Sequence, residues 1–355
     1  MTQKKDKSIL VLRFSSLGDI AMTIPVLRSF SYTYPNQKII FVSRSFTEPL
    51  FSEFENIEFI GVDFNDKYKG LKGLFRLFRR LKKEKIKSVA DLHNVLRTNI
   101  LSFLFILTFK KVKFLNKGRV DRKRLIRDKN KIFKPLTQIH YRYCDVFRRL
   151  GYPVDLANHE YPIKPYLKEN SDEKKLLINS NEKKIIGIAP FASFDGKNYP
   201  LDLMQNVIAY LQKEHLIYLF GGGEEELEKI KVWDKAYKNV INVSSRFNLN
   251  QQINIVNYID MMISMDSANG HIAANYGVPV LTIWGMTHPF CGFTPFDQGI
   301  ENSITIDRNK YPKIPTSIFG NKIPKGYETA FRSIEPKEVI ERALKLLNDS
   351  KLRHN

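Results

Sequence analysis

A turn near the N-terminus combines hydroxyl groups, a glycine and a carboxylate. It reads Phe14-Ser-Ser-Leu-Gly-Asp19 and joins an apolar run to a helical pattern. In an open parallel sheet such a turn opens into the ligand crevice. There Ser16 and the backbone at Gly18 can hydrogen-bond a substrate, and Asp19 can accept a proton. The alternative is that Asp19 only caps the helix, a role that contributes about 1 kcal/mol.

A second turn, Met265-Asp-Ser-Ala-Asn-Gly-His271, follows the apolar run 261–264 and opens another helical pattern. The N-terminus of a helix offers backbone N–H groups and the positive end of the helix dipole, which suit a diphosphate. We expect Asp266 to face the crevice and His271 to reach the same place from inside the helix. The alternative is a capping aspartate together with a core histidine.

Two further turns offer groups suited to a nucleotide. Residues 221–226 read GGGEEE after the apolar run 216–220. Glycines let a backbone approach a ligand closely, and a nearby carboxylate can bind a ribose diol. Lys197 follows the run 184–189 and is placed to meet phosphate charge. The alternative for residues 221–226 is a flexible turn whose acidic residues stabilise the N-terminus of the next helix. The alternative for Lys197 is a solvated lysine in a loop.

Positive charge is concentrated in one half of the chain. The formal net charge is +20; residues 1–150 hold 33 Lys and Arg against 13 Asp and Glu, and residues 151–355 hold 24 of each. The stretch 110–134 alone contains 12 Lys and Arg and two Asp. This density predicts an anionic partner (nucleic acid, phosphorylated lipid or acidic sugar), with a solvated basic loop as the alternative. No helix-turn-helix, zinc or RRM-type signature accompanies it.

The elements that must position these turns are apolar runs alternating with helical patterns. The alternation predicts βαβ units and hence two doubly wound α/β domains that join near residue 165 and hold an active site in the cleft between them. Strands are expected at 8–14, 38–43, 57–62, 88–92, 184–189, 216–220, 239–243, 261–264 and 278–284, and helices at 19–34, 71–85, 97–109, 138–150, 200–212, 224–237, 249–258, 268–276 and 336–347.

Cysteine content and apolar segments bear on the compartment. Cys144 and Cys291 are too few for a disulfide framework, so a reducing cytoplasm is expected. The basic start of the chain lacks the pattern of a signal peptide. The longest apolar stretch, Ile100–Phe109, is about half the length of a membrane span. It predicts first a buried helix and second a helix on a membrane surface.

Five segments, in order along nearly the whole chain, resemble glycosyltransferase family 9, the lipopolysaccharide heptosyltransferase family. They are ILVLRFSSLGDIAMTIPVLRSF, VADLHNVLRTNIL, IAPFASFDGKNYPLDLM, LFGGGEEELEKI and ISMDSANGHIAANYGVPVLTIWGMTHP. The most specific feature is the spacing from Asp266 to His271, followed by Gly-x-Pro before a strand. The family turn often reads Asp-Thr-Gly, whereas Ser267 and Ala268 follow the aspartate here. A donor sugar other than heptose is therefore the alternative.

The resemblance implies a GT-B fold. Residues 1–165 then bind the acceptor, residues 166–334 bind the nucleotide-sugar donor, and a helix in 335–355 packs back on the N-terminal domain. The implied chemistry is inverting and metal-independent, with Asp19 as the base that deprotonates the acceptor hydroxyl. The implied donor-binding residues are Ser193, Lys197, Glu225 (with the register among Glu224, Glu225 and Glu226 open), Asp266, Ser267, Ala268 and His271.

The predicted function is transfer of a heptose from ADP-heptose to a lipopolysaccharide core or lipid A-type acceptor. The partner is expected to be an acidic or phosphorylated glycolipid, met peripherally at the cytoplasmic face of the inner membrane, without nucleic acid. The alternatives are a related transferase for another surface glycan and a non-catalytic basic protein that binds membrane or nucleic acid. A nicotinamide-dependent oxidoreductase is excluded because no GxGxxG follows a strand. The residues expected to contact the acceptor are Ser16, Gly18, Arg97, Arg119, Arg122, Lys123 and Arg124.

Overall fold

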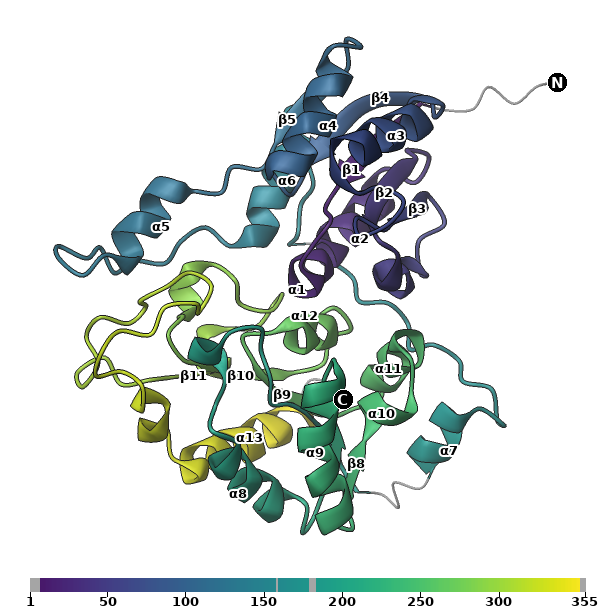
Figure 1. The fold of residues 1–355 in the computed structure, drawn as a ribbon. Helices are drawn as coiled ribbons and strands as arrows, with labels where there is room; N and C mark the ends of the chain where they lie inside the picture. The colour runs from purple at the N-terminus through teal and green to yellow at the C-terminus, as the bar shows by residue number, and fades with distance from the viewer. Residues whose placement is uncertain (1–6, 158, 179–182, 352–355) are drawn as a thin grey trace. The chain divides into compact units, whose positions relative to one another are not determined.

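The computed structural model describes residues 7–157, 159–178 and 183–351. Its contacts divide the chain into two compact units. Unit 1 consists of Met1–Lys117 and Ile139–Glu160, and unit 2 of Gly118–Gln138 and Tyr161–Asn355. Each unit contains one parallel sheet with helices around it (Figure 1), which confirms the prediction of two doubly wound α/β units.

Unit 1 is built on a five-stranded sheet. Its elements are β1 (Ser8–Leu12), α1 (Leu17–Ala21), α2 (Ile24–Thr33), β2 (Ile39–Arg44), the 3-10 helix η1 (Ser45–Phe51), β3 (Ile57–Val62), α3 (Gly70–Lys82), β4 (Ile86–Asp91), α4 (Leu96–Ile106), β5 (Lys111–Phe114) and α6 (Ile139–Leu150). The strand order is β3-β2-β1-β4-β5, with every pair parallel. The direction of winding reverses between β1 and β4, so the turns after these two strands open at the switch point where such folds bind ligands.

The helix predicted over residues 19–34 is interrupted. The structure has α1 ending at Ala21 and α2 beginning at Ile24, with Pro25 in the first turn of α2. Proline lacks an N–H group and is tolerated in the first turn of a helix but not in its interior. The break therefore lies where the proline requires it.

The prediction of a buried helix over Ile100–Phe109 is only half right. The helix α4 buries Leu101 and Phe105, but Phe103, Leu107 and the following Phe109 are exposed. Hydropathy alone did not distinguish the two faces because both are apolar. In the part of the chain that the structure describes, no helix is long and apolar enough to cross a membrane.

Unit 2 is built on a six-stranded sheet. Its elements are α5 (Arg119–Ile126), α7 (Asp172–Ile178), β6 (Ile185–Ala189), η2 (Asp195–Lys197), α8 (Leu201–Leu211), β7 (Leu216–Leu219), α9 (Glu224–Ala236), β8 (Val240–Asn242), α10 (Val243–Arg246), α11 (Leu249–Val256), β9 (Met261–Met265), α12 (Ala268–Ala274), β10 (Val280–Trp284), η3 (Pro289–Cys291), η4 (Ile300–Asn302), β11 (Ser303–Thr305), η5 (Ala330–Ser333) and α13 (Pro336–Lys351). The order β11-β10-β9-β6-β7-β8 places its switch point between β6 and β9.

The structural division differs from the predicted boundary in two segments. Residues 118–138 join unit 2, where the Lys131 ammonium donates to the carbonyls of Lys313 and Pro315 at 2.7 Å each and the Leu136 amide donates to Phe290 O at 2.9 Å. The charge pattern of this segment gave no sign of these contacts, because they involve backbone carbonyls. The C-terminal helix α13, predicted to pack on the N-terminal domain, instead lies in the core of unit 2 through Val339, Ala343 and Leu347.

Candidate functional site

Asp19 lies in the first turn of α1, directly after β1, and holds a network of donors. Its Oδ2 lies 2.5 Å from Arg13 Nη2 and accepts a hydrogen bond from Ser16 Oγ at 3.0 Å. The Ser16 amide also points to Oδ2, at 3.4 Å, so Asp19 and Ser16 form a capping box. Arg13 is buried and donates through Nη1 to Leu92 O at 2.8 Å. Ser16, not Asp19, is therefore the N-cap; Asp19 stabilises the helix start as the N3 residue of the capping box and also holds a buried guanidinium.

The electrostatics around Asp19 keep its carboxylate ionised. Burial by itself raises the pKa of Asp19. The Arg13 guanidinium and the hydrogen bonds from Ser16 lower it by more than burial raises it, so the pKa lies below the ordinary value. An ionised carboxylate at a sheet switch point can accept a proton from a bound hydroxyl. The geometry thus fits a general base, with Arg13 as the group that holds it in place.

His93 lies beside this ion pair and was missed in the sequence. Its Nδ1 accepts a hydrogen bond from the Phe14 amide at 3.3 Å. Burial and then the positive charge of Arg13 lower the pKa of His93 to about 3, so the ring is neutral. The signal was present in the segment VADLHN, where Asp91 ends β4 and accepts from the amides of His93 and Asn94 at 2.9 and 2.7 Å.

The predicted acceptor contacts divide between the units. Ser16, Gly18 and Arg97 belong to unit 1, and the charge of Arg97 is close enough to lower the pKa of His93. The Arg97 guanidinium also lies 5.1 Å from the ring of Phe64. The other predicted contacts fall on α5, which belongs to unit 2. They are Arg119, Arg122, Lys123 and Arg124.

Lys197 and Asp266 form a buried ion pair at the switch point of unit 2. Lys197 ends η2, after β6, and Asp266 directly follows β9, the neighbouring strand. The Lys197 ammonium lies 2.8 Å from Asp266 Oδ2, and the two side chains are only 15% and 5% exposed. Thr287 Oγ1 donates to the same carboxylate oxygen at 3.0 Å. The sequence predicted that Lys197 and the turn at Asp266 contribute to one site, and the structure places them together. The hydrogen bond from Thr287 had no signal in the sequence.

Two glycines shape the space around Lys197. A Cβ on Gly196 would lie 2.3 Å from Gly320 O, so η2 can approach this backbone only because the residue is glycine. Gly320 has a φ of +78°, and a Cβ there would lie 2.4 Å from Lys197 Cγ. The lysine stem is therefore held against the backbone of a second loop, which limits where its ammonium can lie.

The residues after Asp266 open α12. Ser267 is its N-cap with extended backbone, and Ser267 Oγ lies 3.1 Å from Ser264 Oγ. Ala268 is the first residue of the helix. His271 lies one turn further along α12. Its side chain is buried in the interior of unit 2, as the alternative of a core histidine predicts.

The three glutamates after β7 have different surroundings. Glu226 is half-buried, and its Oε2 accepts a hydrogen bond from the Gly222 amide at 2.8 Å. Burial raises the pKa of Glu226. Glu225 points to solvent and pairs with Lys229 at 2.7 Å. Ser193, predicted to lie near the donor phosphates, is exposed in the loop before η2. Of Glu225 and Glu226, it is therefore Glu226 that contacts the glycine turn.

An aromatic and cationic cluster lies in the loop after Thr287. The Arg308 guanidinium stacks 3.4 Å from the centroid of Phe133, and the His288 ring lies 4.9 Å from the same ring. Burial, then Arg308 and Lys131, lower the pKa of His288 to about 4. This cluster fixes the segment around Phe133 to unit 2, and its only sequence signal was the aromatic loop 287–293 itself.

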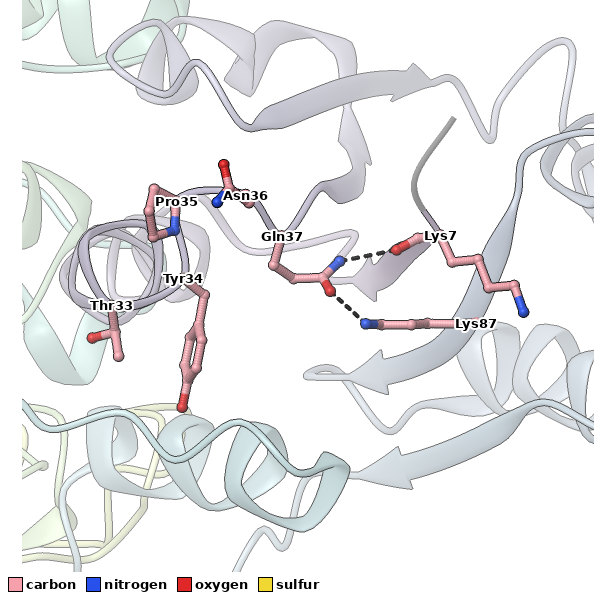
Figure 2. A pocket seen from close by; sticks show the side chains of 7 residues that line it. All are labelled: Lys7, Thr33, Tyr34, Pro35, Asn36, Gln37 and Lys87. Carbon is pink, nitrogen blue, oxygen red and sulfur yellow. Dashed lines mark hydrogen bonds between the residues drawn. The ribbon is translucent and has the colours of Figure 1, made fainter. Parts of the chain in front are cut away.

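A pocket at the other edge of the unit 1 sheet holds no comparable chemistry. In Figure 2 the Gln37 side chain points toward Lys7 and Lys87, donating to Lys7 O at 3.0 Å and accepting from the Lys87 ammonium. These residues precede or begin strands, so the pocket lies at the amino edge, opposite the switch point. Its full lining is Lys7, Thr33, Tyr34, Pro35, Asn36, Gln37 and Lys87.

Metal-ligating side chains do not gather at either site. Across residues 7–157, 159–178 and 183–351, no three His, Cys, Asp or Glu side chains lie together in a way that suits a metal ion. The charged groups that the two sites contain are the pair of Lys197 with Asp266 and the pair of Arg13 with Asp19.

Comparisons with known proteins agree with the fold. The model of glycosyltransferase family 9 (heptosyltransferase) matches residues 74–323. The chain is 24% identical over 291 residues to the lipopolysaccharide core heptosyltransferase OpsX of Haemophilus influenzae, with 80% of each chain covered.

Solved structures of the same architecture cover almost the whole chain. A glycosyltransferase family 9 protein of Veillonella parvula matches with a TM-score of 0.74 and 20% identity, covering 97% of this chain and 98% of that one. The ADP-heptose lps heptosyltransferase II of E. coli matches with a TM-score of 0.65 and 20% identity, covering 97% and 99%. These likenesses confirm the predicted GT-B fold.

Proposed function

Since the chain belongs to glycosyltransferase family 9, the heptosyltransferase family, we propose that it transfers a heptose from ADP-heptose to a lipopolysaccharide-type acceptor. The observation that carries the proposal is the buried pair of Lys197 and Asp266 at the switch point of unit 2, where a nucleotide-sugar would bind. The nature of the sugar and acceptor rests on the names of the relatives, one a lipopolysaccharide core heptosyltransferase and one an ADP-heptose enzyme.

The proposed reaction is a single displacement with inversion. The acceptor oxygen attacks the anomeric carbon of the heptose while the bond from that carbon to the diphosphate oxygen breaks. Asp19 takes the proton of the acceptor hydroxyl, and ADP leaves with the bonding electron pair. The leaving diphosphate gains negative charge, which the ammonium of Lys197 stabilises without a metal ion.

Arg13 controls the protonation state of the proposed base, Asp19. Because its guanidinium lowers the pKa of Asp19, the carboxylate is ionised at neutral pH and ready to accept a proton. The same contact makes the carboxylate a weaker base. We therefore infer that a bound acceptor hydroxyl, by approaching Oδ2, loosens the contact with Arg13 as it delivers its proton.

The remaining donor contacts follow from placement. We assign the ribose carboxylate to Glu226, because Glu226 faces the glycine turn whereas Glu225 pairs with Lys229 at the surface. Ser193 and Ser267 are proposed to hydrogen-bond the donor, and Ala268 and His271 to shape the segment that holds its sugar and diphosphate.

The proposed acceptor contacts come from both units. Ser16, Gly18 and Arg97 are proposed to contact the acceptor near Asp19, and the cations of α5 to meet its acidic or phosphorylated sugars. An acceptor anchored in lipid places the enzyme at the cytoplasmic face of the inner membrane.

Nucleotide binding tests the donor assignment. Because a ligand selective for the native state stabilises it, ADP is expected to raise the unfolding temperature more than GDP, UDP or dTDP, and equally well in EDTA. At a concentration of 100 times Kd the stabilisation amounts to about 2.7 kcal/mol. The measurement is a thermal-shift titration with each nucleotide, with and without EDTA.

Other outcomes separate the alternatives. Preference for another nucleotide leaves the reaction class but discards ADP-heptose, and the methyl group of Ala268 would then be the first place to look. Loss of binding in EDTA contradicts a metal-independent site. The absence of binding to any nucleotide favours the non-catalytic basic protein.

A matched pair of substitutions tests the ribose carboxylate. Glu226→Gln is expected to weaken ADP binding about tenfold, because it removes the charge beside the glycine turn and about 1.4 kcal/mol of a charged hydrogen bond. Glu225→Gln, one residue away and at the surface, is the control and is expected to leave the Kd of ADP unchanged. In calorimetric titrations, equal effects of the two substitutions would contradict the assignment to Glu226, and a larger effect at Glu225 would assign the role to Glu225.

A further inference from the structure

The outer face of α4 carries large apolar side chains in solvent. Leu96, Phe103 and Leu107 are 76%, 57% and 60% exposed, and their spacing of seven and four residues places them on one side of the helix. Phe109, just beyond the helix end, is 98% exposed. A helix that packs only against its own unit would present polar groups here.

The helix α3 extends this apolar surface. It packs beside α4 (Figure 1), with the rings of Phe78 and Phe105 5.1 Å apart. Phe75 and Leu71 precede Phe78 by three and seven residues, so they lie on the same side of α3, and both are exposed. We call Leu71, Phe75, Leu96, Phe103, Leu107 and Phe109 the α3–α4 face.

Cations border the α3–α4 face, and carboxylates are missing from it. No Asp or Glu occurs in residues 70–83 or 92–120. The solvent side of α3 instead exposes Lys72, Arg76, Arg79, Arg80, Lys82 and Lys83. Among the described residues, none of these six forms an ion pair with a carboxylate. Their positive charge is therefore available to an external anion.

This combination selects one kind of partner. Apolar and aromatic side chains flanked by cations are the features with which an interfacial helix enters the headgroup region of an anionic bilayer. Nucleic acid would engage the cations but leave exposed leucine and phenylalanine without a role. We propose that the α3–α4 face docks unit 1 on the surface of an anionic phospholipid bilayer.

The position of this face relates it to the reaction. Leu96 opens α4 four residues after Leu92, whose carbonyl accepts a hydrogen bond from Arg13, the partner of Asp19. The docking surface therefore begins four residues along the chain from a residue that contacts the partner of the proposed base. This part of the inference rests on the proposed function, because it supposes an acceptor that is anchored in the bilayer.

Vesicle binding tests the docking directly. The full-length protein is mixed with vesicles of phosphatidylcholine alone or with about one third phosphatidylglycerol, and bound protein is measured by flotation at low and high salt. We expect binding only to the anionic vesicles, weakened by salt. No binding to them, or equal binding to both compositions, overturns the proposal.

Substitutions locate the surface. Phe103→Gln with Leu107→Gln is expected to lower the vesicle partition coefficient at least tenfold, and Arg79→Gln with Lys82→Gln to lower it and reduce its salt dependence. Tyr210→Gln with Val232→Gln is the matched control, since it removes two exposed apolar side chains from unit 2. Equal unfolding temperatures show that the variants are folded. Unchanged binding in the first pair, or an equal loss in the control, overturns the assignment.

An activity assay separates this proposal from the proposed function. Transfer to a deacylated, water-soluble acceptor is expected to survive Phe103→Gln with Leu107→Gln, whereas transfer to an acceptor in anionic vesicles falls. If the wild type binds vesicles but transfers nothing, the proposed function fails and the docking stands. If it transfers to the soluble acceptor but does not bind vesicles, the docking fails alone. The docking proposal would also be overturned if a short duplex DNA displaced the vesicles from the protein and if binding depended on the cations of α3 but not on Phe103 and Leu107.

Discussion

Replacing Asp19 with Asn is expected to lower kcat by about 10²–10⁴-fold, the usual contribution of a general base. Asn keeps the shape of the side chain and can still accept a hydrogen bond from Ser16, so the helix start is retained. It cannot accept the proton of the acceptor hydroxyl. The measurement is the rate of ADP release at saturating donor and acceptor.

The role of Asp19 as the base also predicts how kcat/KM changes with pH. The pKa of Asp19 is lowered in the folded protein, so the ionised base persists at neutral pH and is lost only as the pH falls through that lowered value. The acid limb of kcat/KM is therefore expected below the ordinary aspartate pKa of about 3.9. The stability that the ion pair with Arg13 contributes is likewise present above the unfolded pKa and lost as the pH falls through the folded one.

The donor site supplies the control for Asp19→Asn. Asp19 belongs to unit 1 and Lys197 to unit 2, so ADP is expected to stabilise the variant as it does the wild type. The buried Arg13 loses its partner, and a lower unfolding temperature is expected; activity is therefore compared well below it. A variant that folds, binds ADP and turns over at the wild-type rate would remove Asp19 from the mechanism.

The sheet architecture and the position of the turns that follow the strands could be predicted from the sequence because both depend on local patterns. Apolar runs before the turns at Asp19, Lys197 and Asp266 gave the strands, and parallel strands bring the turns that follow them to one edge. The pairing of Lys197 with Asp266 was then a consequence of β6 lying beside β9.

The parts that could not be predicted depend on contacts between distant segments. The basic segment around Lys131 joins unit 2 through backbone carbonyls and through the stacking of Phe133 with Arg308, neither of which has a sequence pattern. The segment VADLHN marks the turn that contains His93, but the contact of His93 with the amide of Phe14, 79 residues away, has no sequence pattern. The sequence left open whether the helix around Ile100–Phe109 is buried or lies on a surface, because an apolar helix has the same composition in both cases.

Replacing Lys197 with Met is expected to lower kcat/KM by about 10²–10³-fold, because the diphosphate loses its stabilising charge. The same change leaves the carboxylate of Asp266 buried without its cation, which costs about 3–5 kcal/mol of folding free energy. The single substitution therefore confuses the loss of chemistry with the loss of stability. A second substitution separates the two effects.

The double variant Lys197→Met with Asp266→Asn removes both charges from the site, while Thr287 keeps an acceptor for its hydroxyl. Because replacing a buried ion pair by neutral groups is often neutral or stabilising, the unfolding free energy is expected to return close to that of the wild type. Activity and ADP binding are expected to remain low, since no cation faces the diphosphate. The test is a double-mutant cycle of denaturant unfolding, ADP titration and turnover. If turnover recovers together with stability, Lys197 serves only to neutralise Asp266, and another cation must meet the leaving group.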